Sequence, residues 1–244
     1  MPGPPGPPVP SRNTGVRALL VGVSIAVVVL LVAGGLVVWN LVGGRPYASL
    51  PTCRQLLNDI VDDFPHAESP RVEGEYFDHD EYIDEYDYTE EGDLEGIEGV
   101  LTCSAEETAD TEEENNGDRS FDASLRVNVT LYDAEDERVM EDLRTDTEEL
   151  IEDLEDGDWW GEELDGFEFV DWTELTTGDG GNAILYETDY EGMSSASATF
   201  LTANATVNIS YSLEGRYDEQ EEFEFMTSFS EQLKRQLDKE ADRG

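Results

Sequence analysis

The side chains best suited to chemistry in this sequence are two cysteines, two histidines and an unusually large set of acids. Cys53 and Cys103 are the only cysteines and His66 and His79 the only histidines, whereas Asp and Glu number 59 among 244 residues. Nucleophilic catalysis needs a serine or cysteine beside a positioned base. Neither histidine has a recognisable partner at a telling spacing, so we predict no catalytic residue, no cofactor and no enzymatic activity.

One cluster of acids has the residue types of a weak metal site. Carboxylate oxygens, with an occasional imidazole nitrogen, bind divalent cations, and four such side chains lie close together in the sequence: Asp78, His79, Asp80 and Asp84. The alternative interpretation of the same residues is a solvated acidic loop, and we favour it. Weak binding of divalent cations therefore stays a secondary hypothesis.

The acids are distributed unevenly along the chain. The formal net charge is −45, the first acid is Asp59, and residues 1–45 carry only Arg12, Arg17 and Arg45, so residues 46–244 have a formal charge of −48. Binding of nucleic acid depends on Lys and Arg that neutralise phosphates. This charge excludes DNA, RNA and anionic lipid headgroups as primary partners.

Two interpretations of the negative charge remain open, namely adaptation to salt and a surface that attracts cations or a basic partner. Self-repulsion among like charges destabilises a compact state at low salt, and added salt screens it. We therefore expect the melting temperature to rise between low salt and molar NaCl. A melting temperature that is independent of salt would contradict the first interpretation.

Residues 18–38 form an apolar run of 21 positions in which Ser24 is the only polar side chain. As a helix this run would be about 31 Å long, which matches a hydrocarbon core of about 30 Å. It is too long for the apolar region of a cleaved signal peptide. We predict a cytoplasmic Pro-rich tail at 1–17, a transmembrane helix at 18–42 that anchors the chain in the cell membrane, a linker at 43–50 and an extracytoplasmic domain at 51–240.

The two cysteines follow the predicted span and lie on the same side of it. In an oxidising compartment they would pair, and closing a loop of about 50 residues stabilises the fold by about 4 kcal/mol in the chain-entropy model. The alternatives are two unrelated buried thiols or a metal-binding pair, although no CxxC spacing is present. A disulfide between Cys53 and Cys103 is our prediction, and it would place the domain outside the cytoplasm.

Hydrophobic periodicity predicts a mixed fold. Residues 121–131 alternate apolar and polar side chains as a half-buried antiparallel strand does. Residues 195–215 read as a hairpin that turns near Ala203 and Asn204, with one long strand as the alternative. Residues 70–98 read as an acidic loop. Further strands are expected at 97–105, 167–172 and 183–188, and helices at 52–64, 134–155 and 218–240. We predict an α+β fold, an antiparallel sheet with helices packed on one face, preceded by the single transmembrane helix.

Three short segments carry a resemblance to a known group of proteins. PTCRQLL at 51–57 places a cysteine in a first short helix, GVLTCSAE at 99–106 places the second in a strand, and FLTANATVNISYS at 200–212 precedes a final helix. With the Pro-rich leader and the single span, this layout resembles actinobacterial cell-envelope proteins with lipoprotein- or sensor-like extracytoplasmic domains. The resemblance implies an extracytoplasmic location and a disulfide, and it implies no activity. The long acidic stretch between the cysteines departs from that pattern.

These observations favour a membrane-anchored binding or sensing module whose ligand or protein partner is unknown. The alternative is a structural or interaction protein of the envelope. A deep pocket lined by Trp and Tyr on the sheet would favour the first, and a flat apolar patch the second. Trp159 and Trp160 are candidates to stack on a ligand, although aromatics after a helix more often pack in the core or as a lid, which is the interpretation we favour.

Overall fold

The described part of the chain begins after the predicted span. The computed structural model describes residues 45–64, 70–86, 96–108, 121–157, 167–188, 193–214 and 218–244, all within one unit, Arg45–Gly244. The predicted tail at 1–17 and the predicted transmembrane helix at 18–42 lie outside these residues. No helix within the described ranges is both long and apolar enough to cross a membrane.

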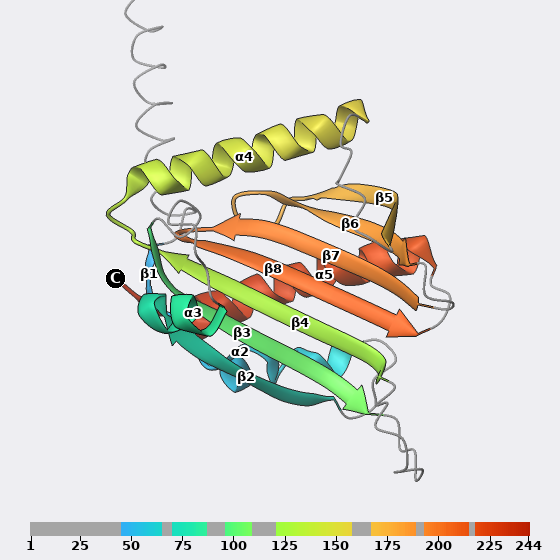
Figure 1. Cartoon of the computed structure of the whole chain (residues 1–244), viewed down its shortest axis with the longest axis horizontal. Helices are drawn as coiled ribbons and strands as arrows, with labels where there is room; N and C mark the ends of the chain where they lie inside the picture. The colour runs from blue at the N-terminus through green and yellow to red at the C-terminus, as the bar shows by residue number, and fades with distance from the viewer. Residues whose placement is uncertain are drawn as a thin grey trace, which may run out of the picture. The chain divides into compact units, whose positions relative to one another are not determined.

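Seven antiparallel strands form the main sheet, in the order β2-β3-β4-β8-β7-β6-β5 (Figure 1). The strict alternation in the sequence lies at its centre, where Val127 of β4 is paired with Ile209 of β8. The antiparallel prediction is confirmed. The strands are β2 (Arg71–Asp78), β3 (Ile97–Thr108), β4 (Phe121–Tyr132), β5 (Phe167–Leu175), β6 (Gly181–Thr188), β7 (Met193–Thr202) and β8 (Ala205–Glu214).

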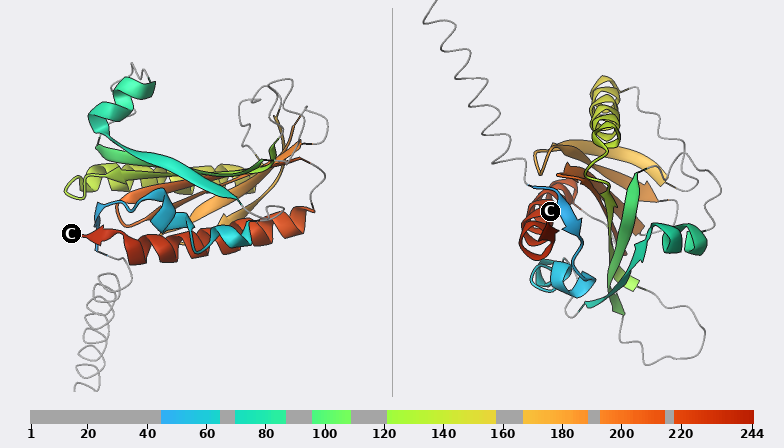
Figure 2. Two further views of the ribbon diagram at one scale, coloured as in Figure 1. Left: turned by 90° about the horizontal axis from the view of Figure 1, so that it is seen from below. Right: turned by 90° about the vertical axis from the view of Figure 1, so that its left-hand side faces the viewer.

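Helices cover both faces of this curved sheet. Figure 2 shows the sheet curving around α2 and α5, with α4 on its outer side. The helices are α2 (Cys53–Leu57), α3 (His79–Tyr86), α4 (Glu137–Asp156) and α5 (Glu219–Glu240), with a 3₁₀-helix at Val61–Asp63. Side-chain caps fix where α2, α4 and α5 begin, on Thr52, Asp136 and Asp218.

The prediction that helices pack on one face only is wrong for α4. Along β6, Ala183 and Leu185 belong to the main core, whereas Ile184 between them is buried outside it. Successive side chains of a strand point to opposite faces, so Ile184 lies on the outer face, where α4 contacts β6. The outer face therefore also carries apolar side chains that are shielded from water. The side chains of Met140 and Leu154 on α4 are buried there.

Residues 45–50 of the predicted linker at 43–50 are instead part of the folded domain. Strand β1 (Tyr47–Ser49) pairs antiparallel with β9 (Asp242–Arg243), so the domain extends beyond both limits of the predicted range 51–240. The side chain of Tyr47 is 1% exposed and its hydroxyl donates to Asp238 Oδ1 at 2.7 Å. Burial of a tyrosine next to a paired carboxylate explains why this short segment is ordered.

The predicted acidic loop at 70–98 is also corrected, because its first part forms β2 and α3. Four consecutive residues of β2, at 73–76, are exposed, so the edge strand lacks the alternation that identifies strands in a sequence. Pairing with β3 along its whole length creates the strand. The helix predicted at 52–64 is shorter than expected, since α2 ends at Leu57 and the 3₁₀-helix follows.

Candidate functional site

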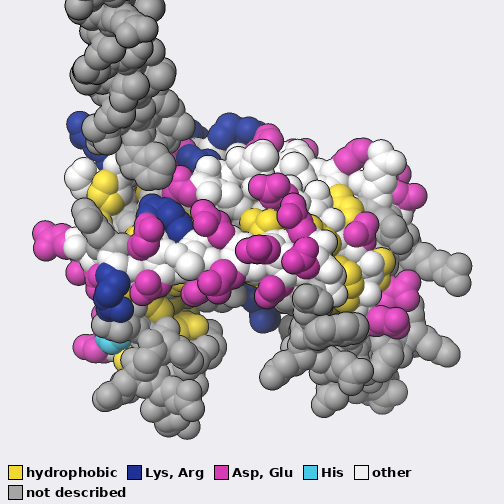
Figure 3. All heavy atoms as spheres, turned by 90° about the horizontal axis from the view of Figure 1, so that it is seen from above, with side chains coloured by type: hydrophobic (Ala, Val, Ile, Leu, Met, Phe, Trp, Pro, Cys, Tyr) yellow, Lys and Arg dark blue, Asp and Glu magenta, His cyan; other side chains and the backbone are white. Residues whose placement is uncertain are grey.

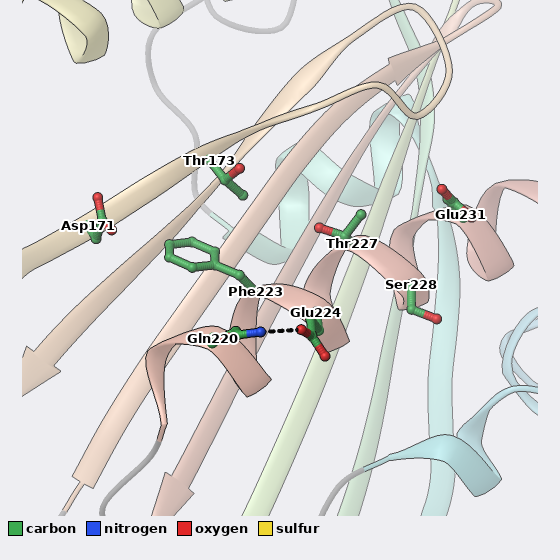
Figure 4. A pocket seen from close by; sticks show the side chains of 8 residues that line it. All are labelled: Asp171, Thr173, Gln220, Phe223, Glu224, Thr227, Ser228 and Glu231. Carbon is green, nitrogen blue, oxygen red and sulfur yellow. Dashed lines mark hydrogen bonds between the residues drawn. The ribbon is translucent and has the colours of Figure 1, made fainter.

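A groove of about 600 Å³ lies between the edge strand β5 and the N-terminal half of α5 (Figure 4). Asp171 and Thr173 line it from β5. The α5 residues recur every three or four positions and so form one stripe of the helix: Gln220, Phe223, Glu224, Thr227, Ser228 and Glu231. This stripe lies beside the buried stripe of α5 that packs against the sheet. One side of the helix therefore contributes to the core, and the neighbouring side lines the groove.

Phe223 forms an apolar wall of the groove. Its side chain is half-buried, packs against the main core and in Figure 4 extends from α5 toward β5, on the side of Thr173. An aromatic face attracts a cation that stands within about 6 Å of the ring centroid. The groove thus has an apolar surface that can also accept a positive charge.

Three carboxylates line the groove with this ring, and none of the described residues that line it is Lys, Arg or His. Glu224 accepts a hydrogen bond from Gln220 Nε2 at 2.7 Å, and Glu231 lies 3.6 Å from Arg235 of the same helix. Asp171 Oδ1 accepts from the backbone N–H of Trp172 at 2.9 Å. Hydrogen bonds and ion pairs between exposed side chains are weak, so a bound cation could replace these partners of the carboxylates. The charge of these lining side chains would therefore attract a positively charged ligand.

A second hollow, about 770 Å³ in volume, lies between α2 and β2. Two bases, Arg54 and Arg71, and two acids, Asp62 and Glu73, line it, so their charges cancel. Arg71 is already paired with Glu73 at 2.6 Å. This hollow has no charge complementarity to a ligand of either sign, and the groove beside β5 is the stronger candidate.

A buried carboxyl group lies on the core side of the groove helix. Glu222 is 7% exposed, and its Oε2 has no hydrogen-bond partner among the described residues. Burial, together with the charge of Glu221, raises the pKa of Glu222 to about 7. Burial, with a further contribution from Glu222, raises the pKa of Tyr211, whose hydroxyl also lacks a partner within the described ranges.

This carboxyl group makes stability depend on pH. Because its pKa is raised in the folded state, the carboxyl contributes stability below its ordinary pKa of 4.5, and that contribution is lost as pH rises to about 7. We expect Glu222→Gln to match the wild type at pH 4.5 and to be more stable by about 2 to 3 kcal/mol at pH 8. Urea unfolding of both proteins across this range measures the difference.

The matched control is Glu221→Gln, which removes an exposed acid one residue away. Its advantage over the wild type should stay below about 0.5 kcal/mol at pH 8. Equal stabilisation by the two variants would mean that the effect comes from net charge and not from burial of Glu222.

The predicted disulfide is present. Cys53 of α2 and Cys103 of β3 are bonded, with their Cα atoms 5.3 Å apart, and both are buried. Gly74 of β2 lies over the bond with φ +148°, and a Cβ there would stand 2.4 Å from Cys53 Sγ and 2.2 Å from the carbonyl oxygen of Thr102. Only glycine lets the edge strand approach the disulfide this closely.

The structure does not bring the candidate metal ligands into a site. Among the described residues, no group of three or more His, Cys, Asp or Glu side chains is placed to hold a metal ion. Asp78 instead caps α3, because its Oδ1 accepts from the N–H of Glu81 at 2.9 Å. His79 and Asp80 lie in the first turn of that helix, and the side chain of Asp84 lies outside the described part.

The other singled-out residues cannot be placed relative to the groove. His66, Trp159 and Trp160 lie outside the described residues. Within the described ranges, Tyr76 and Phe169 are the large hydrophobic side chains that are exposed, and they lie on the two opposite edge strands. These two aromatics therefore cannot share a flat patch, and none of the described residues that line the two hollows above is Trp or Tyr.

The comparisons with known proteins show no family for the chain. No protein-family model and no curated protein matches the chain. Among solved structures, it is similar to the extracellular domain of PknH from Mycobacterium tuberculosis, with 12% sequence identity, a TM-score of 0.47, and coverage of 81% of this chain and 100% of that one. Similarity at this level says nothing about ligand or activity.

Sequence reasoning missed the groove. A signal was present in α5, where positions 220, 223, 224, 227, 228 and 231 follow a helical period beside the apolar stripe. The partner residues Asp171 and Thr173 could not be found in this way, because strand β5 reaches α5 only through the order of strands in the sheet.

Proposed function

We propose that this protein is a non-enzymatic binding or sensing module that takes a cationic ligand in the groove between β5 and α5. The observation that carries the proposal is the set of three carboxylates, on Asp171, Glu224 and Glu231, that line the groove together with the half-buried ring of Phe223. The ring and the carboxylates attract a positive charge for different physical reasons, and a cation between them would gain from both.

The domain is proposed to act outside the cytoplasm, tethered by the apolar segment at 18–42. Support comes from the bonded pair Cys53 and Cys103, since structural disulfides persist in oxidising compartments. The remaining surface also favours cations near the domain. Figure 3, which looks onto α4, shows Asp and Glu side chains gathered along that helix. The exposed ones are Glu141, Asp142, Asp146, Glu148, Glu149, Glu152, Asp153, Glu155 and Asp156.

The hydroxyls in the groove support binding better than catalysis. Thr173, Thr227 and Ser228 line it without a histidine or lysine to act as their base. These hydroxyls can donate and accept hydrogen bonds, and they would fix the orientation of a polar ligand.

Titration of spermine into the full-length chain in an uncharged detergent tests the proposal. The variant Asp171→Asn/Glu224→Gln/Glu231→Gln removes the three groove carboxylates without changing their shape. Each exposed ion pair is worth a few tenths to 1 kcal/mol, so the affinity should fall about tenfold in total. Phe223→Leu should cost a further two- to fivefold, because it keeps apolar volume and loses the ring face.

The matched control neutralises three exposed acids of α4, as Glu148→Gln/Glu152→Gln/Glu155→Gln. This variant has the same net charge as the groove variant, so it lowers diffuse attraction equally. Its affinity for spermine should fall less than twofold. If both triple variants weaken binding to the same extent, cations bind the surface diffusely and the groove is not the site.

A further inference from the structure

The groove has the geometry of a place where a strand can be added to the sheet. Within the described residues, β5 pairs with β6 alone, so its other side is a free edge. An edge strand presents N–H and C=O groups that lack partners, and an extended peptide can pair with them. Helix α5 packs over the inner face of the sheet on β6 and β7 and lines the groove together with β5, so an added strand would present the side chains of one face toward α5 (Figure 4).

The hydrogen bond of Trp172 identifies which backbone groups are available. Its N–H donates to the carboxylate of Asp171 at 2.9 Å, a partner outside the ladder with β6. Along an antiparallel strand the outward N–H groups alternate, so those of Trp172 and Glu174 point to the free edge. The Asp171 carboxylate accepts a hydrogen bond from the N–H of Trp172. A backbone carbonyl oxygen of an incoming peptide could replace this carboxylate as the acceptor.

A bulge at Val170 limits the free edge to its second half. The register with β6 shifts between Phe169 and Asp171, and Val170 packs against the core. Bulges interrupt pairing, so regular addition is confined to residues 171–175. This is the part of β5 that lines the groove through Asp171 and Thr173.

The charge around this edge selects the kind of peptide. Side chains on one face of an added strand would point toward α5, where Glu224 and Glu231 stand on either side of the half-buried Thr227. Lys or Arg at alternate positions would meet these carboxylates, whereas acidic side chains would be repelled.

We propose that the groove binds an extended basic peptide segment that pairs with residues 171–175 of β5 as an additional antiparallel or parallel strand. The inference rests on the proposed function, because it identifies the ligand class and binding mode of the same groove. The backbone edge gives affinity, and the carboxylates of α5 give the preference for alternate basic side chains.

Selective backbone methylation tests this mode without altering the protein. The probe is a fluorescent acetylated heptapeptide amide of alternating Lys and Val, titrated into the full-length chain. In one derivative the Lys nitrogens are N-methylated, and in the other the Val nitrogens are. Only alternate N–H groups of an added strand face its neighbour. One derivative should therefore bind at least tenfold more weakly than the parent peptide, and the other within about threefold of it.

Hydrogen exchange gives a second readout. Binding of the unmethylated peptide should slow amide exchange in 171–175 at least fivefold and leave β2, the opposite edge strand, unchanged. The strand-addition mode is overturned if both methylated peptides bind equally well, or if β2 is protected as strongly as β5. In those cases spermine binding that depends on the groove carboxylates would still support the proposed function. If neither spermine nor the peptide distinguishes the groove variant from the α4 variant, the proposed function fails as well.

Discussion

Replacing Asn204 with alanine is expected to destabilise the domain by about 3 kcal/mol. The side chain is 3% exposed and accepts from the N–H of Tyr47 at 2.7 Å. Its Nδ2 donates to the carbonyl oxygens of Tyr47 at 3.2 Å and of Tyr132 at 2.7 Å. The alanine variant leaves these backbone groups without that partner, and each such buried group costs about 1 to 3 kcal/mol. Urea unfolding of the full-length chain measures the loss.

A second asparagine of the same hairpin provides the control. Asn208 of β8 is half-buried and accepts one hydrogen bond, from Thr199 Oγ1 at 2.7 Å. Asn208→Ala should cost below about 1 kcal/mol, because one side-chain hydrogen bond is lost and water can reach the site. If the two variants are equally stable, the bonds of Asn204 to β1 and β4 do not hold the fold together.

Asn204 also connects β1 to the main sheet. It stands in the β7–β8 turn and fastens β1, the segment nearest the predicted span, to the centre of the sheet. Arg243 of β9 adds a contact over the ring of Tyr47, 4.0 Å from its centroid. Amide exchange in residues 45–50 should therefore accelerate in Asn204→Ala, while exchange in the β5–β6 hairpin should not change.

Removal of the disulfide is expected to cost about 4 kcal/mol. The bond joins residues 50 positions apart and closes the loop that contains β2, and such a loop corresponds to about 4 kcal/mol in the chain-entropy model. Cys53→Ala/Cys103→Ala should therefore unfold at a clearly lower urea concentration than the wild type. The full-length chain isolated from cells with thiols blocked should take up a thiol reagent only after reduction.

Comparison with a reduced wild type separates the cross-link from the lost side chains. Both sulfur atoms are buried, since Cys53 is 5% and Cys103 0% exposed, so reduction should need partial unfolding. Once reduced in urea, the wild type should show nearly the same stability as the double alanine variant. A double variant as stable as the oxidised protein would mean that the bond does not stabilise the fold.

Local sequence patterns predicted most of the regular elements. The alternation of β4 and β8, the turn at Ala203 and Asn204, and the apolar stripe of α5 are properties of single segments, and each appears in the structure where it was expected. The helix predicted at 134–155 is α4, which is capped by Gly157 with φ 70°. The α+β class followed from these elements and their order.

Elements without such a pattern depend on partners that are distant in the sequence. Strand β2 forms because each of its residues pairs with a residue of β3. Strand β1 forms because it pairs with β9 and is hydrogen-bonded to the side chain of Asn204. The placement of α4 on the outer face could not be read from its own stripe, because a stripe shows that one side is buried and not which surface covers it.

The sequence alone determined that the chain has a strongly acidic domain after an apolar segment, with an antiparallel α+β fold, and it predicted the disulfide that the structure contains. These follow from composition and from the short periods of helices and strands, which are local quantities. Only the tertiary structure decided that Asp171 stands opposite Phe223 and Glu224, and that Asn204 holds the strand at residue 47. Such contacts join residues about 50 to 160 positions apart, so they depend on strand order and register, which no single segment encodes.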